Sequence, residues 1–316
     1  MSEPLVSICI PTYQRAATLA RALDSALAQT HPRLEVVISD NASGDGTAEL
    51  CRAVAAADAR VRYLRQERNL GPTANFNALF AACRGDYVLM LADDDWLDPG
   101  YVAACLAALR ADPGAALIAG VARYWRDGHY AFPGVVHEHR QSDPAARVLA
   151  YLTAVDDNGV FYGLVPRAVL ERARPLPNVL GNDWLHVARI AGQAGIGTAS
   201  EVSVHRSLGG TSVDVGSILE TFGGSGSGWQ ARLPQLVIAW ELLRDIGWGH
   251  PVYAPLGRWR RLALGLASAA ASMRWRALAW HLISPSVARL ARRPRGRAVW
   301  ALYDRLTRAL GAGRRP

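Results

Sequence analysis

The first hundred residues alternate between short apolar runs and longer segments whose apolar residues recur every three or four positions. A short β-branched run that ends in polar or turn residues predicts a strand, and the three-to-four spacing predicts a helix. These patterns predict strands at 5–10, 34–39, 61–64 and 87–92, and helices at 18–29, 47–57 and 73–83. Such alternation is typical of crossover units in a parallel sheet, so the sequence predicts an α/β fold.

The pattern is less regular after residue 100. It predicts helices at 101–109, 167–173, 183–194 and 233–245, an extended segment at 158–166, and a hairpin of 116–125 and 129–136 around Asp127-Gly128. Residues 221–228, TFGGSGSG, are interpreted as a flexible hinge or lid, with a plain linker as the alternative. Beyond Pro255 the pattern predicts amphipathic helices that break at Pro285 and Pro294.

Composition narrows the classes of function. Half of the 316 residues are hydrophobic, which predicts a folded chain. All 35 basic residues are arginine, and the absence of lysine excludes a lysine Schiff base, a Walker A phosphate loop and the kinase ion pair. Four separated cysteines lie in apolar or helical patterns and are expected to be buried free thiols: Cys9, Cys51, Cys83 and Cys105.

The charge is unevenly distributed. From Pro251 onward there are 14 arginines and one acid, a net charge of +13, whereas residues 1–250 carry 21 arginines and 26 acids, a net charge of −5. Two apolar stripes at helical spacing accompany these arginines: Trp259, Leu262, Ala263, Leu266, Ala270 and Met273, then Val299, Leu302, Tyr303, Leu306 and Leu310. We therefore expect residues 251–316 to contact an anionic membrane surface.

The sequence is also consistent with other partners for this basic tail. The stripes would equally pack on the catalytic body or on a second subunit, which would make the protein a homo-oligomer. Nucleic acid is not expected, because no nucleic-acid motif accompanies the charge. The N-terminus has no basic leader and no apolar stretch reaches the ~18 residues that a spanning helix needs. We expect a cytoplasmic protein, or a peripheral one at the inner face of the cytoplasmic membrane.

Polar residues follow the predicted strands. Pro11, Thr12 and Tyr13 follow the first strand, Asp40 and Asn41 the second, and Asp93, Asp94 and Asp95 the fourth. Ligands of an open parallel sheet bind beyond these strand ends. Carboxylates there suit Mn²⁺ or Mg²⁺, which bind through one or two carboxylates and substrate phosphates. The alternative is that Asp94 or Asp95 caps the next helix while the others face water.

Four stretches in order resemble one known family. They are SICIPTYQR at 7–15, VVISDNASGDGT at 36–47, NLGPTANFN at 69–77 and GDYVLMLADDDWLDP at 85–99, with a weaker match at GNDW, 181–184. Together they resemble the inverting family 2 glycosyltransferases of bacterial envelope polysaccharide synthesis. The resemblance covers roughly the first 210 residues. It implies the GT-A fold, a Rossmann-like mixed, mainly parallel sheet flanked by helices, here with a C-terminal helical extension.

The resemblance also implies donor-binding residues. It assigns Pro11, Thr12, Tyr13, Arg15, Asp40, Asn69, Gly71 and Asp93 to the nucleotide sugar, most simply UDP-linked, and Asp94 and Asp95 to Mn²⁺ or Mg²⁺. Tyr13 would stack on the base, Asp40 would accept from the base or ribose, and Asp93 would meet the ribose. Ala92 replaces the first acid of the family's Asp-x-Asp-Asp motif. An Asx turn is the alternative for Asp40, and a turn brace for Asn69.

The same resemblance places the catalytic base at Asp183, which would take the proton of the attacking acceptor hydroxyl. A favourable charge at a helix N-terminus is its alternative role. His205 and Arg206 lie where the family closes over the diphosphate, and a surface histidine is the alternative for His205. Trp184 and Trp125 would form an acceptor platform or belong to the core.

The sequence therefore predicts a metal-dependent inverting glycosyltransferase that acts on a growing envelope glycan, free or lipid-linked, such as O-antigen or capsule. Transfer onto polyprenyl phosphate, and a non-catalytic glycan-binding or scaffolding protein, are the alternatives. The predicted organisation is a catalytic domain at 1–215, with a nucleotide-sugar half at 1–100 and an acceptor half at 101–215. A linker or lid and a helix follow at 216–250, and the basic helical tail at 251–316.

Overall fold

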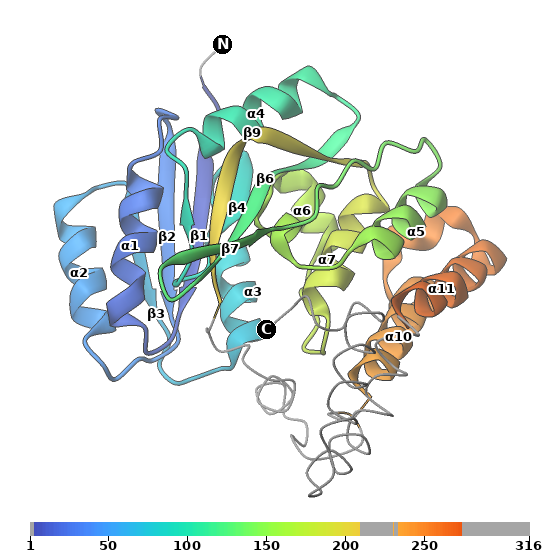
Figure 1. Ribbon diagram of the computed structural model, residues 1–316. Coiled ribbons are helices and arrows are strands. Elements are labelled where there is room, and N and C mark those ends of the chain that lie inside the picture. Colours follow the sequence, from blue (N-terminus) through green and yellow to red (C-terminus); the bar gives the residue numbers. More distant parts are fainter. Residues whose placement is uncertain (1–2, 209–229, 231–232, 274–316) are drawn as a thin grey trace, which may run out of the picture.

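The computed structural model describes residues 3–208, 230 and 233–273. Within them, nine strands form one twisted sheet in the order β3-β2-β1-β4-β8-β6-β9-β5, with β7 paired to β6 (Figure 1). The pairs among β3, β2, β1 and β4 are parallel, as is β6 with β9, and the remaining pairs are antiparallel. Helices flank this sheet, so the predicted α/β fold with a mixed sheet is confirmed.

The N-terminal half alternates as predicted. Its elements are β1 (Val6–Thr12), α1 (Ala16–Leu27), β2 (Leu34–Asp40), α2 (Thr47–Ala57), β3 (Val61–Arg65), α3 (Pro72–Ala82) and β4 (Tyr87–Met90). All seven residues of β2 are buried, because the sheet is covered on both faces. In the parallel register Thr12 of β1 lies beside Asp40 of β2, so the strand ends that carry polar residues meet at one edge.

The second half of the described chain supplies the elements on the other side of this polar edge of the sheet. They are β5 (Trp96–Leu97), α4 (Tyr101–Ala111), β6 (Ala115–Arg126), β7 (His129–Pro133), α5 (Pro144–Ala154), η1 (Gly159–Tyr162), β8 (Leu164–Pro166), α6 (Arg167–Ala173), α7 (Asn182–Ala191) and β9 (Gly195–Leu208). The predicted hairpin is confirmed: Asp127 and Gly128 both have positive φ, 49° and 79°, as its tight turn requires.

Two predictions for this half are wrong. The segment 158–166 is not uniformly extended, because the Asp157 carboxylate accepts a hydrogen bond from the Gly159 N–H and starts the 3₁₀ turn η1 before β8. The helix predicted at 183–194 ends at Ala191, and Gly195 instead begins the long strand β9. The pattern predicted neither β9 nor α5, whose N-terminus is capped by Asp143 with Pro144 in its first turn.

The C-terminal part that the structure describes is helical. It consists of α10 (Pro234–Arg244), a π-helical turn η2 (Asp245–Gly249), a 3₁₀ turn η3 (Pro251–Leu256) and α11 (Arg258–Ser272). Helices α10 and α11 lie side by side, and α11 also packs along α5 (Figure 1). The predicted hinge at 221–228, the stripe at 299–310 and the domain boundary at 215 lie outside the described residues, and the division into domains stays a prediction.

A buried ion pair holds this C-terminal part against α7. Arg189 of α7 donates from Nε and Nη2 to the two carboxylate oxygens of Asp245, at 3.0 and 2.6 Å. Its Nη1 donates to the carbonyls of Ala173 and Pro175. Only 5% of the Arg189 side chain and 12% of the Asp245 side chain are exposed. The pair therefore fixes η2 to the end of α6 and to α7 at once.

The four cysteines are buried free thiols, as predicted. No helix among the described residues is both long enough and apolar enough to span a bilayer.

We expect Asp245→Ala to lower the free energy of unfolding by about 3 kcal/mol or more, because it leaves the Arg189 guanidinium buried without its carboxylate. Glu49→Ala removes an acid from an exposed helical pair, since Glu49 and its partner Arg52 are 71% and 57% exposed, so its cost should stay below about 1 kcal/mol. Urea denaturation of both variants measures the difference, and equal losses would contradict the structural role of the Arg189–Asp245 pair.

Candidate active site

One cavity of about 930 Å³ lies at the polar edge of the sheet. The carboxyl ends of β1 and β4, the N-terminal turns of α3 and α7, and η1, β9 and α10 all contribute to its walls. Ten of the thirteen residues that the sequence assigned to the site line this cavity: Pro11, Thr12, Tyr13, Arg15, Asn69, Gly71, Asp93, Asp94, Asp183 and Arg206. The structure thus brings together residues that lie up to 195 positions apart.

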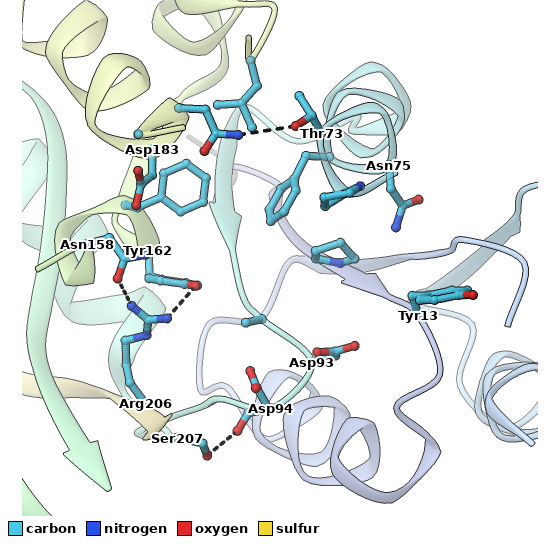
Figure 2. Close-up of a pocket in the computed structure, with 18 of the residues that line it drawn as sticks. Tyr13, Thr73, Asn75, Asp93, Asp94, Asn158, Tyr162, Asp183, Arg206 and Ser207 are labelled. Carbon is cyan, nitrogen blue, oxygen red and sulfur yellow. Dashed lines mark hydrogen bonds between the residues drawn. The ribbon is translucent and has the colours of Figure 1, made fainter. Parts of the chain in front are cut away.

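Asp93 and Asp94 lie on one side of the cavity, directly after β4 (Figure 2). Burial, together with the charge of Asp94, raises the pKa of Asp93 to about 7. The Asp94 carboxylate faces Arg15 Nη1 at 3.5 Å, and its backbone carbonyl accepts from Arg21 and Ser207. Two neighbouring carboxylates beside open space form a pair of hard oxygen ligands.

The chemistry of this donor set fits a divalent cation held jointly with a phosphate-bearing substrate. The described residues contain no cluster of three His, Cys, Asp or Glu side chains that would enclose a metal by themselves. Mg²⁺ and similar ions commonly take only one or two carboxylates and complete their shell with water and substrate phosphates. Asp94 and the neighbouring Asp93 provide two such carboxylates.

Asp95 faces away from the cavity. It is 1% exposed, and its two oxygens accept hydrogen bonds from Arg206 Nε at 2.9 Å and from the Ser207 N–H at 2.8 Å. Burial raises the pKa of Asp95, and the charge of Arg206 opposes that rise. Both oxygens of Asp95 thus hold β9 in place, and the assignment of Asp95 to a metal stays a prediction.

His205 also lies outside the cavity. The Trp125 indole N–H donates to its Nδ1 at 3.0 Å, which leaves the proton on Nε2 to be donated to Asp98 at 2.9 Å. The ring stacks on Trp96 with centroids 5.0 Å apart. With both nitrogens engaged and one face covered, His205 connects β9 to β5 and β6. Neither His205 nor its neighbour Trp125 lines the cavity, and the diphosphate contact of His205 stays a prediction.

Asp40 is fully buried and does not line the cavity. Its carboxylate accepts from the Ser43 N–H at 2.8 Å and from the Tyr63 hydroxyl at 2.7 Å. The first of these contacts holds the loop after β2, although it reaches three residues along the chain and an Asx turn reaches two. Asn69 does line the cavity, but its Oδ1 accepts from Asn41 and from the Gly71 N–H, so it also braces the loop.

Tyr13 presents its ring at the edge of the cavity (Figure 2). The side chain is 41% exposed, unusual for a tyrosine in a core and suited to a stacking platform for a planar ligand. Arg15, three residues into the same loop stretch, adds a cation beside Asp94.

Asp183 lies on the opposite side of the cavity, at the start of α7 (Figure 2). Gly181 precedes the helix with φ 76°, a left-handed conformation that glycine adopts without strain and that turns the chain into α7. Asp183 Oδ1 accepts from the Trp184 N–H at 2.9 Å. Burial raises the pKa of Asp183, while hydrogen bonds from Trp184 and Asn158 and the charge of Arg206 lower it.

Arg206 connects Asp95 to the surroundings of Asp183. Besides its Asp95 contact, it donates from Nη1 to the Asn158 side-chain oxygen and from Nη2 to the Tyr162 hydroxyl at 3.0 Å (Figure 2). Since the Asn158 oxygen accepts from Arg206, the amide nitrogen of Asn158 is the atom that donates to Asp183. The guanidinium also lies 4.3 Å from the centroid of the Tyr162 ring.

Sequence reasoning missed several residues of this site. Asn158 and Tyr162 were read only as part of an extended segment, although Asp156, Asp157 and Asn158 form a polar triplet ahead of an apolar run. The apolar walls beside Asp183 were also missed, and no sequence pattern indicates them, because they come from four separate elements or loops: Phe76, Phe161, Leu176, Leu180 and Ile238.

Comparison with known proteins gives a family match. The family model described as glycosyl transferase family 2 matches residues 7–162. Chondroitin synthase of Escherichia coli is 40% identical over 109 residues, 34% of this chain and 16% of that protein. A GalNAc(5)-diNAcBac-PP-undecaprenol beta-1,3-glucosyltransferase of Campylobacter jejuni is 27% identical over 190 residues, 58% of this chain and 60% of that protein. The chain thus spans less than two thirds of these relatives.

The fold also matches solved structures. Mannosyltransferase PcManGT of Pyrobaculum calidifontis, solved in complex with GDP-Man and Mn²⁺, superposes with a TM-score of 0.54 at 20% identity. The match covers 99% of this chain and 87% of that one. At this identity the likeness shows the fold alone.

We expect a double-mutant cycle of Asp95→Asn and Arg206→Met to give a coupling free energy of about 2 kcal/mol or more, because either single change leaves a buried partner uncompensated. Chemical denaturation of the four proteins measures it. The exposed pair Glu3–Arg110 serves as the control cycle and should couple far more weakly, because solvent screens it. Similar coupling free energies in both cycles would contradict the conclusion that the buried Asp95–Arg206 pair stabilises the fold more than an exposed pair does.

Proposed function

Because the chain belongs to glycosyl transferase family 2 through residues 7–162 and has the GT-A fold, we propose that it is a metal-dependent inverting transferase. It moves a sugar from a nucleotide donor to a hydroxyl of a growing cell-envelope glycan. The observation that carries this proposal is the single cavity in which Asp93 and Asp94 face Asp183 across open space. A leaving diphosphate needs positive charge on one side and the attacking hydroxyl needs a base on the other.

The donor would lie along the strand ends. Tyr13 would stack on the base, Pro11 and Thr12 would border the nucleotide, and Asn69 and Gly71 would close its loop side. We propose a UDP-linked sugar. Asp40 is not part of this contact set, since its carboxylate is buried and already paired.

Asp94, with Asp93 beside it, would hold Mn²⁺ or Mg²⁺. Such an ion supplies Lewis-acid stabilisation of the charge that develops on the diphosphate. The chain has no lysine, so its own cations at the cavity are arginines. Arg15 faces the acidic pair, whereas three nitrogens of Arg206 already donate to Asp95, Asn158 and Tyr162. Arg206 therefore serves mainly to position the base side of the cavity.

Asp183 would accept the proton of the acceptor hydroxyl as that oxygen attacks the anomeric carbon. Its carboxylate is held in place by Trp184 and Asn158, and its raised pKa makes it a stronger base than an exposed aspartate. Phe161, Leu180 and Ile238 give the same cavity an apolar wall.

The acceptor we propose is a lipid-linked glycan, and the protein would then work as a peripheral protein at the inner face of the cytoplasmic membrane. The apolar wall favours it, and the Campylobacter jejuni relative is named for an undecaprenol-linked glycan. Transfer onto polyprenyl phosphate and a non-catalytic glycan-binding role are the competing functions. The first would proceed without any sugar acceptor, and the second would survive loss of Asp183.

We expect one nucleotide sugar, a UDP sugar, to raise the melting temperature in a donor panel with Mn²⁺, and EDTA to abolish that rise. Ligand at about 100 times its dissociation constant stabilises the folded state by about 2.7 kcal/mol. Asp183→Asn should keep this donor-dependent shift and lose about 10²–10⁴-fold in turnover, the range that general base catalysis supplies. Unchanged turnover of Asp183→Asn would exclude the proposed mechanism, and a GDP sugar as the only stabiliser would exclude the proposed donor.

The pH profile tests the contact between Asn158 and Asp183. The base is active as a carboxylate, so kcat/KM falls as pH drops through its pKa, which burial already holds above the usual aspartate range. Asn158→Ala removes a donor to the charged form and should move this acid limb upward by about one pH unit. Asn158→Ser keeps a donor group and should give a smaller shift. A lower kcat with an unmoved acid limb would mean that Asn158 has only a structural role.

A further inference from the structure

Helix α11 presents its apolar stripe to the outside. Its buried side consists mainly of small residues, Gly265, Ser268 and Ser272, with Leu264. Gly265 permits this close packing, since an added Cβ would lie 3.1 Å from the Leu243 side chain of α10. A surface helix normally buries its apolar stripe, so this orientation is the reverse of the usual one.

The outward stripe follows helical spacing. Trp259 is 75% exposed and Leu266 is 55% exposed. Ala263 and Ala270 are also exposed, so the four residues recur every three or four positions along one face of the helix. These residues belong to the first stripe that the sequence predicted. Packing of that stripe on the catalytic body is therefore wrong for Trp259 and Leu266.

The neighbouring segment adds two exposed tryptophans. Trp240 of α10 and Trp248 of η2 are 55% and 53% exposed, and their rings meet edge to face with centroids 6.3 Å apart. We call Trp240, Trp248, Trp259 and Leu266, which lie on the adjoining segments α10, η2 and α11, the tryptophan surface. These four are half of the eight large apolar side chains that are exposed among the described residues.

The charges around the tryptophan surface select its partner. The Arg258 guanidinium lies 5.3 Å from the Trp259 ring, whereas Arg260 is exposed but pairs with Asp143 at 2.6 Å. A second copy would bring together two segments that each carry +13 from Pro251 onward. Residues 274–316 hold 11 arginines and one acid, so folding this stretch back would also set arginine against arginine. Both arrangements are opposed by like charge, whereas an anionic surface is attracted.

We propose that α10, η2 and α11 dock on an anionic lipid bilayer through the tryptophan surface. Indole rings favour the level of the headgroups, because each has an apolar body and one N–H donor. Arg258 beside Trp259 would pair with a lipid phosphate. Ile238, two residues before Trp240, lines the cavity from the opposite face of α10, so docking would place that cavity one helix diameter, about 10 Å, behind the tryptophans. Only this relation between the cavity and the bilayer rests on the proposed function, through its lipid-linked acceptor.

The test is co-sedimentation of the full chain with vesicles of phosphatidylglycerol and phosphatidylcholine, compared with phosphatidylcholine alone. The wild-type chain should bind the anionic vesicles preferentially. The double variants Trp259→Ser/Leu266→Ser and Trp240→Ser/Trp248→Ser should each lower the partition coefficient by about tenfold or more, since each removes two large apolar side chains from the contact. Their melting temperatures should stay near that of the wild type, because the replaced side chains are exposed.

The matched control is Tyr130→Ser/Val136→Ser, which removes two apolar side chains of similar exposure, 51% and 55%, from another part of the molecule. It should bind as the wild type does. Failure of the wild type to bind, or equal binding by all variants, would overturn the proposal. So would a wild-type dimer that the tryptophan variants dissociate while vesicle binding stays unchanged. Asp183→Asn should bind vesicles normally, so the outcome is independent of the proposed catalysis.

Discussion

The buried pair of Asp95 and Arg206 is the contact on which the active site depends. Asp95 follows the central strand β4, which carries the acidic residues, and Arg206 lies near the end of β9, 111 positions later. The same guanidinium holds Asn158 and Tyr162, which lie in and beside η1. One ion pair therefore sets the acidic side of the cavity in register with the side that holds the base. Lysine at position 206 would not reproduce these contacts, since the planar guanidinium of arginine donates to all three partners at once.

The N-terminal half of the fold follows from local patterns in the sequence. Its strands are buried β-branched runs and its helices have clear apolar spacing, so each element is decided by its own residues, and α2 begins and ends where predicted. The second half depends on distant partners. Strand β9 is rich in small and polar residues and becomes a strand through its long pairing with β6. No pattern of spacing within 195–208 indicates that pairing.

The site shows the same division. The sequence identified which strand ends carry polar residues, and ten predicted residues do meet in the cavity. It could not show which side chains are already engaged by partners elsewhere. Asp40 is held by Tyr63, Asp95 by Arg206, and His205 by Trp125 and Asp98. A motif gives the position of a carboxylate or an imidazole along the chain, but its availability to a ligand is decided by tertiary contacts.

Helix α7 has a further consequence through the Arg189–Asp245 pair. Asp183, the proposed base, lies in the first turn of the helix, and six residues later Arg189 binds the turn η2 that carries Trp248. At 1.5 Å per residue this is a rise of about 9 Å along one short rigid rod. The base and the tryptophan-bearing turn therefore move as one body. With the turn resting on a bilayer, the height of the reaction above the lipid headgroups would be a fixed dimension of the protein, and the length of an acceptor would decide whether its hydroxyl reaches the base.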